Sequence, residues 1–297
     1  MGLMKANEQT ELISAAGLEG PLVRELQVTI KLARAAGAAA LVHYGGPLHI
    51  IHKSENEDPV TQADYAANDL IVRGLTTEFP ADGLLSEESV DTVRRLDRAR
   101  VWIVDPLDGT KGFIAGNGDF AVQIGLAIEG APALGVVYLP DTDVLYYAAR
   151  GHGAWVVRRE TGAERLRVSQ QVKLPHLRLA VSRNHRSPKM DTVVRAFGFK
   201  EQVARGSVGI KIGLIVERQC DLYIHLSPRT KQWDTCAPEA ILHEAGGRLT
   251  DLWGVPYRYN TEDVQNRNGL IATNGAAHDE VIAHFAPLLA EFGRKRM

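Results

Sequence analysis

The chain has 297 residues, of which 45% are hydrophobic and 24% are charged, a globular composition that excludes a fibre, a coiled coil and a disordered chain. Its length is typical of two packed domains. The formal net charge of −2 provides no overall field that would favour nucleic acid or a membrane surface, so we expect neither as a partner.

Targeting signals and cysteines bear on the compartment. No apolar run reaches the ~18 residues that a membrane-spanning helix needs, and the first residues, MGLMKANEQTELIS, lack the apolar segment of a signal peptide. Cys220 and Cys236 form no Cys-x-x-Cys pair. Two free thiols fit a reducing compartment, so we expect a cytoplasmic protein.

Helices are expected first in chain order. Apolar side chains recur at helical spacing over residues 21–44 and from about Asp64 to Glu78. In the second helix, the apolar side chains expected to face inward are Tyr65, Leu70, Ile71 and Leu75.

Strands are expected next. Residues 121–128 alternate large apolar side chains with small or polar ones, which predicts a half-buried strand. Pro-Asp and Gly-His-Gly turns separate further expected strands, and together these predict an antiparallel meander. The further strands are expected at 134–139, 144–149 and 154–158.

Strands and helices alternate from about residue 175. Ser187 followed by Pro188 is the start signal of a helix that runs to about Phe197. Other helices are expected at Thr235–Ala245 and 276–291, and strands at LRLAVS, CDLYIHL, GRLTDL and GLIAT. We therefore predict an α+β domain over 1–174 with an antiparallel sheet, and an α/β domain over 175–297.

The stretch WIVDPLDGTKGF at residues 102–113 carries the strongest chemical signal. Asp105 ends an apolar strand, and Pro106 stops that strand because proline cannot donate to a ladder. The turn can bring Asp105 and Asp108 to one side with the Leu107 carbonyl between them, and these are the hard oxygen ligands that magnesium prefers. Backbone N–H groups at Gly109 and the next residue would face an anion if a helix starts there.

Each acidic segment also has a simpler interpretation. Aspartates in such a turn often cap backbone groups, and Asp64 and Asp234 both stand where a helix begins, as N-caps do. Glu87, in the stretch LLSEES, follows a short apolar strand and is alone typical of a solvated loop. Haloacid-dehalogenase-type phosphatases also place an apolar strand before an Asp-rich Gly-Thr motif, but their carboxylates are two residues apart rather than three.

Taken together and in this order, four blocks resemble the lithium-sensitive, magnesium-dependent phosphatase superfamily that includes inositol monophosphatases and 3'(2'),5'-bisphosphate nucleotidases. The blocks are PVTQAD, SEES, WIVDPLDGTKGF and KQWDTCAPEAILHEAGGRLTD, between residues 59 and 251. The third and fourth are most similar to the bisphosphate nucleotidases, the CysQ type included. Gly112 departs from this pattern, since Glu is common there. The resemblance implies the layered α-β-α-β-α sugar-phosphatase fold.

The resemblance also implies a site with two to three Mg²⁺ ions. Glu87, Asp105 and the Leu107 carbonyl match the ligands of one ion. Asp105, Asp108 and Asp234 match those of a second, so Asp105 would bridge the two. Glu87 also matches a contact of a third, weaker ion. Without cations, carboxylates gathered in this way would repel one another, which is typical of a metal site rather than a core.

Two further roles follow from the resemblance. Asp64 and Thr110 match the pair that orients and deprotonates the attacking water. His185 resembles a histidine beside the nucleotide, and Lys211, after a Gly-rich stretch, resembles a substrate-binding lysine. Their alternatives are a surface loop residue and a solvated lysine at a helix start. The full set of expected substrate-binding residues is Gly109, Thr110, His185, Ser207, Lys211, Lys231 and Asp234.

The expected activity is Mg²⁺-dependent hydrolysis of the 3'-phosphate of adenosine 3',5'-bisphosphate, giving AMP and phosphate. A further expected substrate is 3'-phosphoadenylyl sulfate. The alternatives are an inositol mono- or polyphosphate phosphatase, and a nucleotide- or metal-binding protein without catalysis. We expect a monomer or a homodimer.

Overall fold

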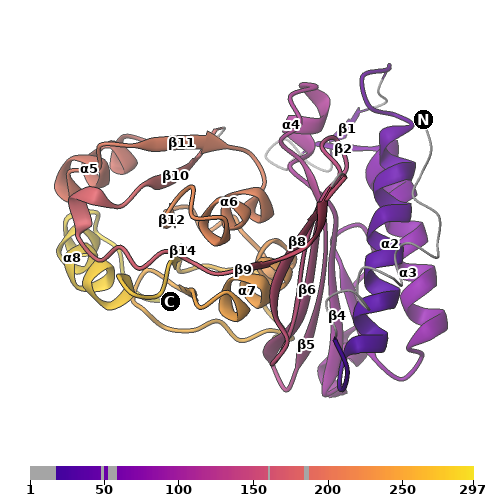
Figure 1. Cartoon of the computed structure of the whole chain (residues 1–297). Coiled ribbons are helices and arrows are strands. Elements are labelled where there is room, and N and C mark those ends of the chain that lie inside the picture. The colour runs from indigo at the N-terminus through magenta and orange to yellow at the C-terminus, as the bar shows by residue number, and fades with distance from the viewer. Residues whose placement is uncertain (1–17, 48–49, 53–58, 160, 184–186) are drawn as a thin grey trace.

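The layered arrangement predicted above is confirmed. The protein is described by a computed structural model that covers residues 18–47, 50–52, 59–159, 161–183 and 187–297. Figure 1 shows a helix pair, a large sheet, a second helix pair, a smaller sheet and a third helix pair in succession. None of the helices in these ranges combines the length and the apolar character that a membrane crossing requires.

The large sheet has seven strands in the order β3-β4-β5-β6-β7-β8-β9. Strand β3 pairs parallel to β4, and all the other pairs are antiparallel, which confirms the predicted meander. The strands are β3 Gly83–Ser86, β4 Arg100–Asp108, β5 Ala121–Ile128, β6 Ala131–Leu139, β7 Val144–Ala149, β8 Gly153–Arg158 and β9 Thr161–Leu166.

Two helices, α2 (Val23–Leu41) and α3 (Gln62–Glu78), cover the outer face of this sheet. In α3, Ile71 and Leu75 are buried as predicted. The prediction for Tyr65 and Leu70 was wrong, because both are 39% exposed. The buried stripe of α3 follows an i, i+4 spacing that contains Ile71 and Leu75, and these two side chains lie off it.

Strand β5 also differs from its prediction, because both of its faces are buried. Val122, Ile124 and Leu126 pack toward α2 and α3. The opposite face, with its small side chains, packs under α7 (Gln232–Glu244). A Cβ atom on Gly125 would lie 2.7 Å from Sγ of Cys236, so the close approach of this helix requires glycine. The small residues therefore mark a second buried face rather than an exposed one.

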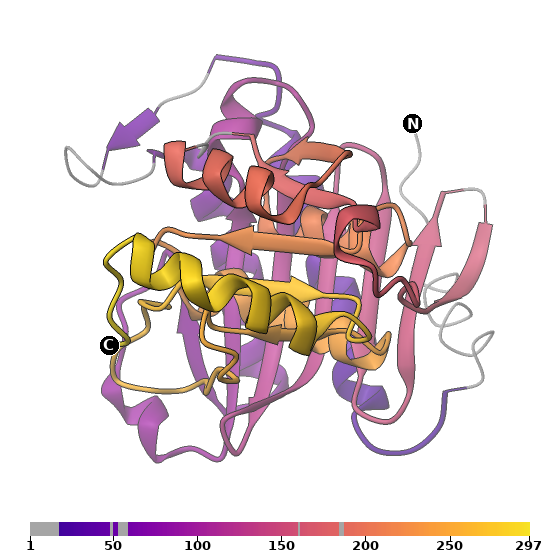
Figure 2. The same cartoon turned by 90° about the vertical axis from the view of Figure 1, so that its left-hand side faces the viewer.

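The smaller sheet has five strands in the order β11-β10-β12-β14-β13. Helices α6 (Val208–Val216) and α7 lie between the two sheets, and α5 (Pro188–Phe197) and α8 (His278–Glu291) cover the far face, which Figure 2 shows in front. The strands are β10 Leu179–Ser182, β11 Gln202–Arg205, β12 Leu222–His225, β13 Arg248–Thr250 and β14 Leu270–Thr273.

The segment between β9 and β10 links the two sheets, and the domain boundary predicted between residues 174 and 175 falls in this segment. That boundary stays a prediction. The remaining short elements are β1 Ile50–His52, β2 Pro59–Thr61, α4 Thr110–Ile114 and the 3-10 turns Val93–Asp97 and Leu174–His176.

Candidate active site

A cavity of about 140 Å³ lies where the end of β4 meets the first turns of α6 and α7. It brings together segments that are more than a hundred residues apart in the chain. Its lining residues include Glu87, Asp105, Leu107, Asp108, Gly109, Thr110, Lys111, Ser182, Gly206, Ser207, Val208, Lys211, Tyr223, His225, Arg229, Thr230 and Asp234.

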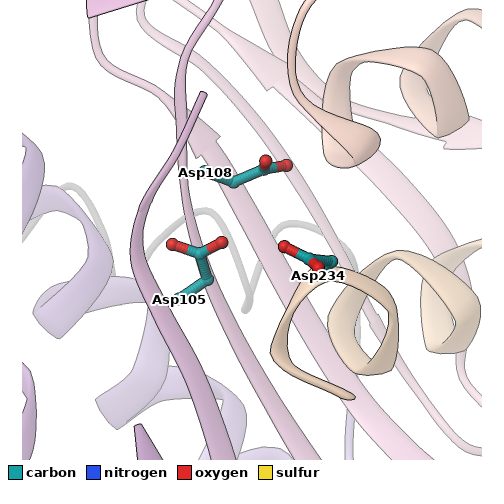
Figure 3. A group of neighbouring side chains, drawn as sticks. All are labelled: Asp105, Asp108 and Asp234. Atoms are coloured by element: carbon teal, nitrogen blue, oxygen red, sulfur yellow. The ribbon is translucent and has the colours of Figure 1, made fainter. Parts of the chain in front are cut away.

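Three carboxylates converge in this cavity (Figure 3). Each of Asp105, Asp108 and Asp234 offers one oxygen, and these oxygens all lie within 4.8 Å of one another. The pairing of β4 with β5 shifts register between Asp105 and Asp108, and this irregularity of the strand lies between the two carboxylates. Asp234 comes from the first turn of α7. Hard oxygen atoms at this spacing suit a divalent cation.

Asp105 is the most enclosed of the three, with 1% of its surface exposed. Burial raises the pKa of its carboxyl well above the usual value, and the charges of Glu87, Asp108 and Asp234 raise it further. The Leu107 N–H donates a hydrogen bond of 3.0 Å to Asp105 Oδ1 and opposes this shift. A bound cation would relieve the same repulsion.

Asp108 is held by the start of α6, one of the two helices that lie between the sheets. Its Oδ2 accepts hydrogen bonds from Ser207 Oγ at 2.6 Å, Val208 N at 2.6 Å and Gln123 Nε2 at 2.8 Å. Burial raises the pKa of the Asp108 carboxyl, while the Ser207 hydrogen bond and the Lys211 charge lower it. Within the described chain, all of its hydrogen bonds go to Oδ2, so Oδ1 accepts none.

Asp64 and Thr110 form a hydrogen-bonded pair beside the carboxylates. Thr110 Oγ1 lies 3.1 Å from Asp64 Oδ1 and 3.2 Å from the Leu107 carbonyl oxygen, both of which can accept its proton. Asp64 Oδ2 accepts from the N–H of Thr61 at 2.8 Å and from its hydroxyl at 2.7 Å. Burial raises the pKa of Asp64 to about 6, against the lowering effect of the Thr61 hydrogen bonds.

The simpler interpretation of Asp64 and Asp234 as caps is close to what the structure shows. Both occupy the third position of their helices rather than the N-cap itself. Asp64 accepts from Thr61, the N-cap residue of α3, and Asp234 Oδ2 accepts from the Lys231 N–H at 2.6 Å. Capping uses one oxygen of each carboxylate, so it does not exclude a second role for the other.

Two of the expected substrate-binding residues, Gly109 and Lys211, are closely packed against the backbone of neighbouring segments. Gly109 stands at φ +98° before α4, where a Cβ would overlap the Asp119 carbonyl oxygen. Lys211 is 3% exposed, rather than solvated, and donates to the carbonyl oxygens of Gly206 and Ser207. Burial lowers its pKa to about 8.

Lys231 is not in the cavity wall. The ammonium group of Lys231 lies 4.9 Å from the centre of the Trp233 ring, and the residue lines neither this cavity nor its larger neighbour. His185 lies outside the described residues. The role predicted for each stays a prediction.

Sequence reasoning missed Gln123, whose side-chain amide fixes Asp108 from strand β5. It also missed Asp119, which is buried, accepts from the Gly206 N–H at 2.8 Å and forms an ion pair with Arg183 at 2.7 Å. A signal for Gln123 was available, since it is the only residue of β5 with a polar side chain.

The comparisons with known proteins identify the family of the chain. The model of the inositol monophosphatase family matches residues 22–289, and the chain belongs to that family. The 3'(2'),5'-bisphosphate nucleotidase CysQ of Escherichia coli K12 is 38% identical over 244 residues, which cover 80% of this chain and 95% of the relative.

Two solved structures are similar throughout. The chain of CysQ from Bacteroides thetaiotaomicron superposes with a TM-score of 0.71 at 33% identity, covering 85% of this chain and 97% of that one. An IMPase of Thermotoga maritima superposes with a TM-score of 0.77 at 26% identity, covering 91% of this chain and 100% of that one. The fold is therefore that of an inositol monophosphatase.

Proposed function

We propose that this protein is a Mg²⁺-dependent phosphomonoesterase that hydrolyses the 3'-phosphate of adenosine 3',5'-bisphosphate to AMP and phosphate. The observation that carries the proposal is the cluster of Asp105, Asp108 and Asp234 beside the Thr110–Asp64 pair, in one cavity. The similarity to proteins named as bisphosphate nucleotidases supports this choice of substrate. We include 3'-phosphoadenylyl sulfate as a further substrate.

We propose that the site holds two to three magnesium ions. Glu87, Asp105 and the Leu107 carbonyl would hold one ion, and Asp105, Asp108 and Asp234 a second, with Glu87 also next to a third. Support comes from the closeness of the three aspartate oxygens and from the mutual repulsion that raises the pKa of Asp105. When bound, magnesium would offset the charge of the phosphate, lower the pKa of bound water and stabilise the leaving alkoxide.

The protein itself would handle the proton of the attacking water. The Thr110 hydroxyl would accept this proton at Oγ1 while passing its own to Asp64 Oδ1 along the existing 3.1 Å hydrogen bond. Thr61 holds Asp64 by its other oxygen, so the accepting oxygen is fixed toward Thr110. A carboxyl with a pKa of about 6 can take and release a proton near neutral pH.

Substrate contacts are proposed from the cavity wall. Gly109 and Thr110 would present backbone N–H groups to the scissile phosphate, and Ser207 and Asp234 would lie on the side of the leaving group. Lys211 would contribute positive charge from beneath the cavity. Lys231 and His185 stay in the proposed set on the family resemblance alone.

We place the enzyme in the cytoplasm, as a monomer or a homodimer that acts on a small phosphorylated molecule. The two cysteines, free and buried, are compatible with a reducing compartment.

A phosphate-release assay tests the proposal. Adenosine 3',5'-bisphosphate and inositol 1-phosphate would be compared at equal concentration, with and without Mg²⁺. We expect release from the bisphosphate that requires Mg²⁺ and exceeds release from the inositol phosphate. The reverse preference would favour the inositol-phosphatase alternative, and no release from either, with intact binding, would indicate a binding protein.

A further inference from the structure

A second and larger cavity, of about 400 Å³, adjoins the carboxylate cavity. The two share the lining residues Ser182, His225 and Arg229, so they are neighbouring parts of one depression. A substrate held by its phosphate over Asp105 has room to extend into this second cavity. Its lining residues are Val181, Ser182, Ser187, Lys189, Met190, Gln202, Ile224, His225, Leu226, Ser227, Arg229 and Arg294.

The charges that line the second cavity have one sign. Lys189, Arg229 and Arg294 contribute three cations, and no aspartate or glutamate is among the described lining residues. The wall also carries apolar side chains, such as Met190 and Ile224. Cationic and apolar surface together match a leaving group that has an apolar ring and an anion.

Arg294 belongs to the segment after α8, which hydrogen bonds hold beside the second cavity. Its N–H donates to the Leu289 carbonyl at 2.9 Å, just after the end of α8. Three residues later, Met297 N and Asn268 Oδ1 lie 3.0 Å apart, and Asn268 Nδ2 donates to the Met297 carbonyl at 3.2 Å. On the other side, Lys189 Nζ donates to the Phe292 carbonyl at 3.2 Å. These contacts hold the segment on both sides of Arg294.

The Arg294 side chain itself is half-buried and makes no hydrogen bond or ion pair to any residue that the structure describes. Burial lowers the pKa of its guanidinium group. A guanidinium group with no counter-charge among the described residues is available to pair with an anionic ligand. Residue 294 also lies beyond residues 22–289, which match the family model, so membership of the family does not imply a role for it.

We propose that the second cavity receives the leaving group of the phosphomonoester, and that Arg294, together with Arg229, binds a second anionic group on it. The enzyme would thereby select phosphomonoesters whose leaving group carries another phosphate or a sulfate. This inference rests on the proposed function and adds the residue that sets its selectivity. A planar guanidinium suits this task because it can donate two parallel hydrogen bonds to a phosphate.

The assignment to Arg294 also follows from the contacts of Lys211 and Lys231, the two lysines expected to bind substrate. Lys211 donates to two backbone carbonyls beneath the cavity, and the Lys231 ammonium lies over the Trp233 ring. Neither residue lines the second cavity.

The test compares Arg294→Gln with Arg296→Gln. The control removes the same charge two residues away, at an exposed residue that lines neither cavity. For each protein, kcat/KM is measured for adenosine 3',5'-bisphosphate and for adenosine 3'-monophosphate, which lacks the second anion. Arg294→Gln should lower the ratio of kcat/KM for the bisphosphate to kcat/KM for the monophosphate at least about tenfold, which is about 1.4 kcal/mol. Arg296→Gln should leave the ratio as it is in the wild type.

An unchanged ratio in Arg294→Gln would overturn the inference. An equal fall of the ratio in Arg294→Gln and in Arg296→Gln would also overturn it. A wild type that hydrolyses neither substrate would contradict the proposed function instead. In that case the dissociation constants of the same two compounds, measured by calorimetry on the same three proteins, would decide the role of Arg294. The inference then requires that Arg294→Gln weaken binding of the bisphosphate by a similar factor more than binding of the monophosphate.

Discussion

The Ser207 hydroxyl donates a 2.6 Å hydrogen bond to Oδ2 of Asp108, and this contact joins the start of α6 to the end of β4. Ser207 is also the N-cap of α6, since its Oγ lies 3.3 Å from the N–H of Ile210. One side chain therefore begins a helix and orients a carboxylate of the cluster. The position of Asp108 depends on the packing of one sheet against elements of the other.

Ser207→Ala should weaken Mg²⁺ activation. A hydrogen bond to a charged group contributes about 1.5–3 kcal/mol, so we expect the Mg²⁺ concentration for half-maximal activity to rise roughly tenfold or more. Ser169→Ala is the matched control, because it removes a serine hydrogen bond to Asp221, which is not in the cavity wall. A Mg²⁺ titration that is the same for the two variants would contradict the role given to Ser207.

Asp105→Asn should abolish most activity and leave the fold intact. The side chain is the same size, and its carbonyl oxygen can still accept from the Leu107 N–H. Removal of one charge from a cluster that repels itself should hold or raise the melting temperature without Mg²⁺. Added Mg²⁺ should stabilise the wild type more than the variant. Near wild-type turnover at saturating Mg²⁺ would refute the proposed metal site.

Lithium should inhibit the enzyme, as the resemblance to lithium-sensitive phosphatases implies. Li⁺ would take one of the magnesium positions among the clustered carboxylates. Activity should fall with added LiCl and not with equal NaCl or KCl, since ordinary ionic screening acts alike for all three salts. Three superimposable inhibition curves would count against the assignment.

His278 should make stability fall at mildly acidic pH. Burial lowers the pKa of this histidine from 6.5 to about 4, and its ring nitrogens lie 2.9 Å from Thr273 Oγ1 and 3.1 Å from Thr250 Oγ1. Between these pKa values the unfolded chain binds a proton that the folded protein does not. The free energy of unfolding should therefore fall as pH falls through this window, by up to about 1.4 kcal/mol per pH unit.

Urea unfolding near neutral pH and near pH 5 measures this effect. His278→Gln should lose less stability between the two conditions than the wild type. His284→Gln, an exposed residue on the same helix, is the control and should behave as the wild type does. A pH dependence that His278→Gln leaves unchanged would assign the effect to other groups.

Gly112→Ala should destabilise the protein. A Cβ at this position would lie 2.5 Å from the Asp119 carbonyl oxygen and 3.0 Å from Asn117 Oδ1. Overpacking of this kind costs about 1–3 kcal/mol, or a few degrees in melting temperature. Gly162→Ala, where a Cβ meets nothing within 4 Å, is the control. Equal melting temperatures for the two variants would show that the loop around Asp119 can move aside.

The sequence predicts the meander and β7 at 144–149 because hydrophobic periodicity reflects burial directly, whereas the order of the layers came from the family resemblance. Periodicity could not reveal that β5 is covered on both sides, since that depends on α7, which lies far along the chain. Strands β9 and β11 escaped prediction because they are short and largely polar edge strands.

Some residues of the candidate site could likewise be predicted from the sequence, and others could not. Asp105 and Asp108 are close in sequence and could be predicted to converge, whereas Asp234 needed the resemblance to place it beside them. Gln123 and Arg294 belong to no motif, so only the folded chain shows that Gln123 hydrogen-bonds to Asp108 and that Arg294 lines the second cavity.

Helix α7 lies against the glycines of the large sheet and carries the thiol of Cys236 at a fully buried point, two residues after Asp234. No reagent can reach this sulfur while the helix is seated. Any opening that exposes it also withdraws Asp234 from its two partner carboxylates. The rate at which an alkylating agent modifies Cys236 therefore measures how often α7 separates from the large sheet. Enzyme activity should be lost at the same rate.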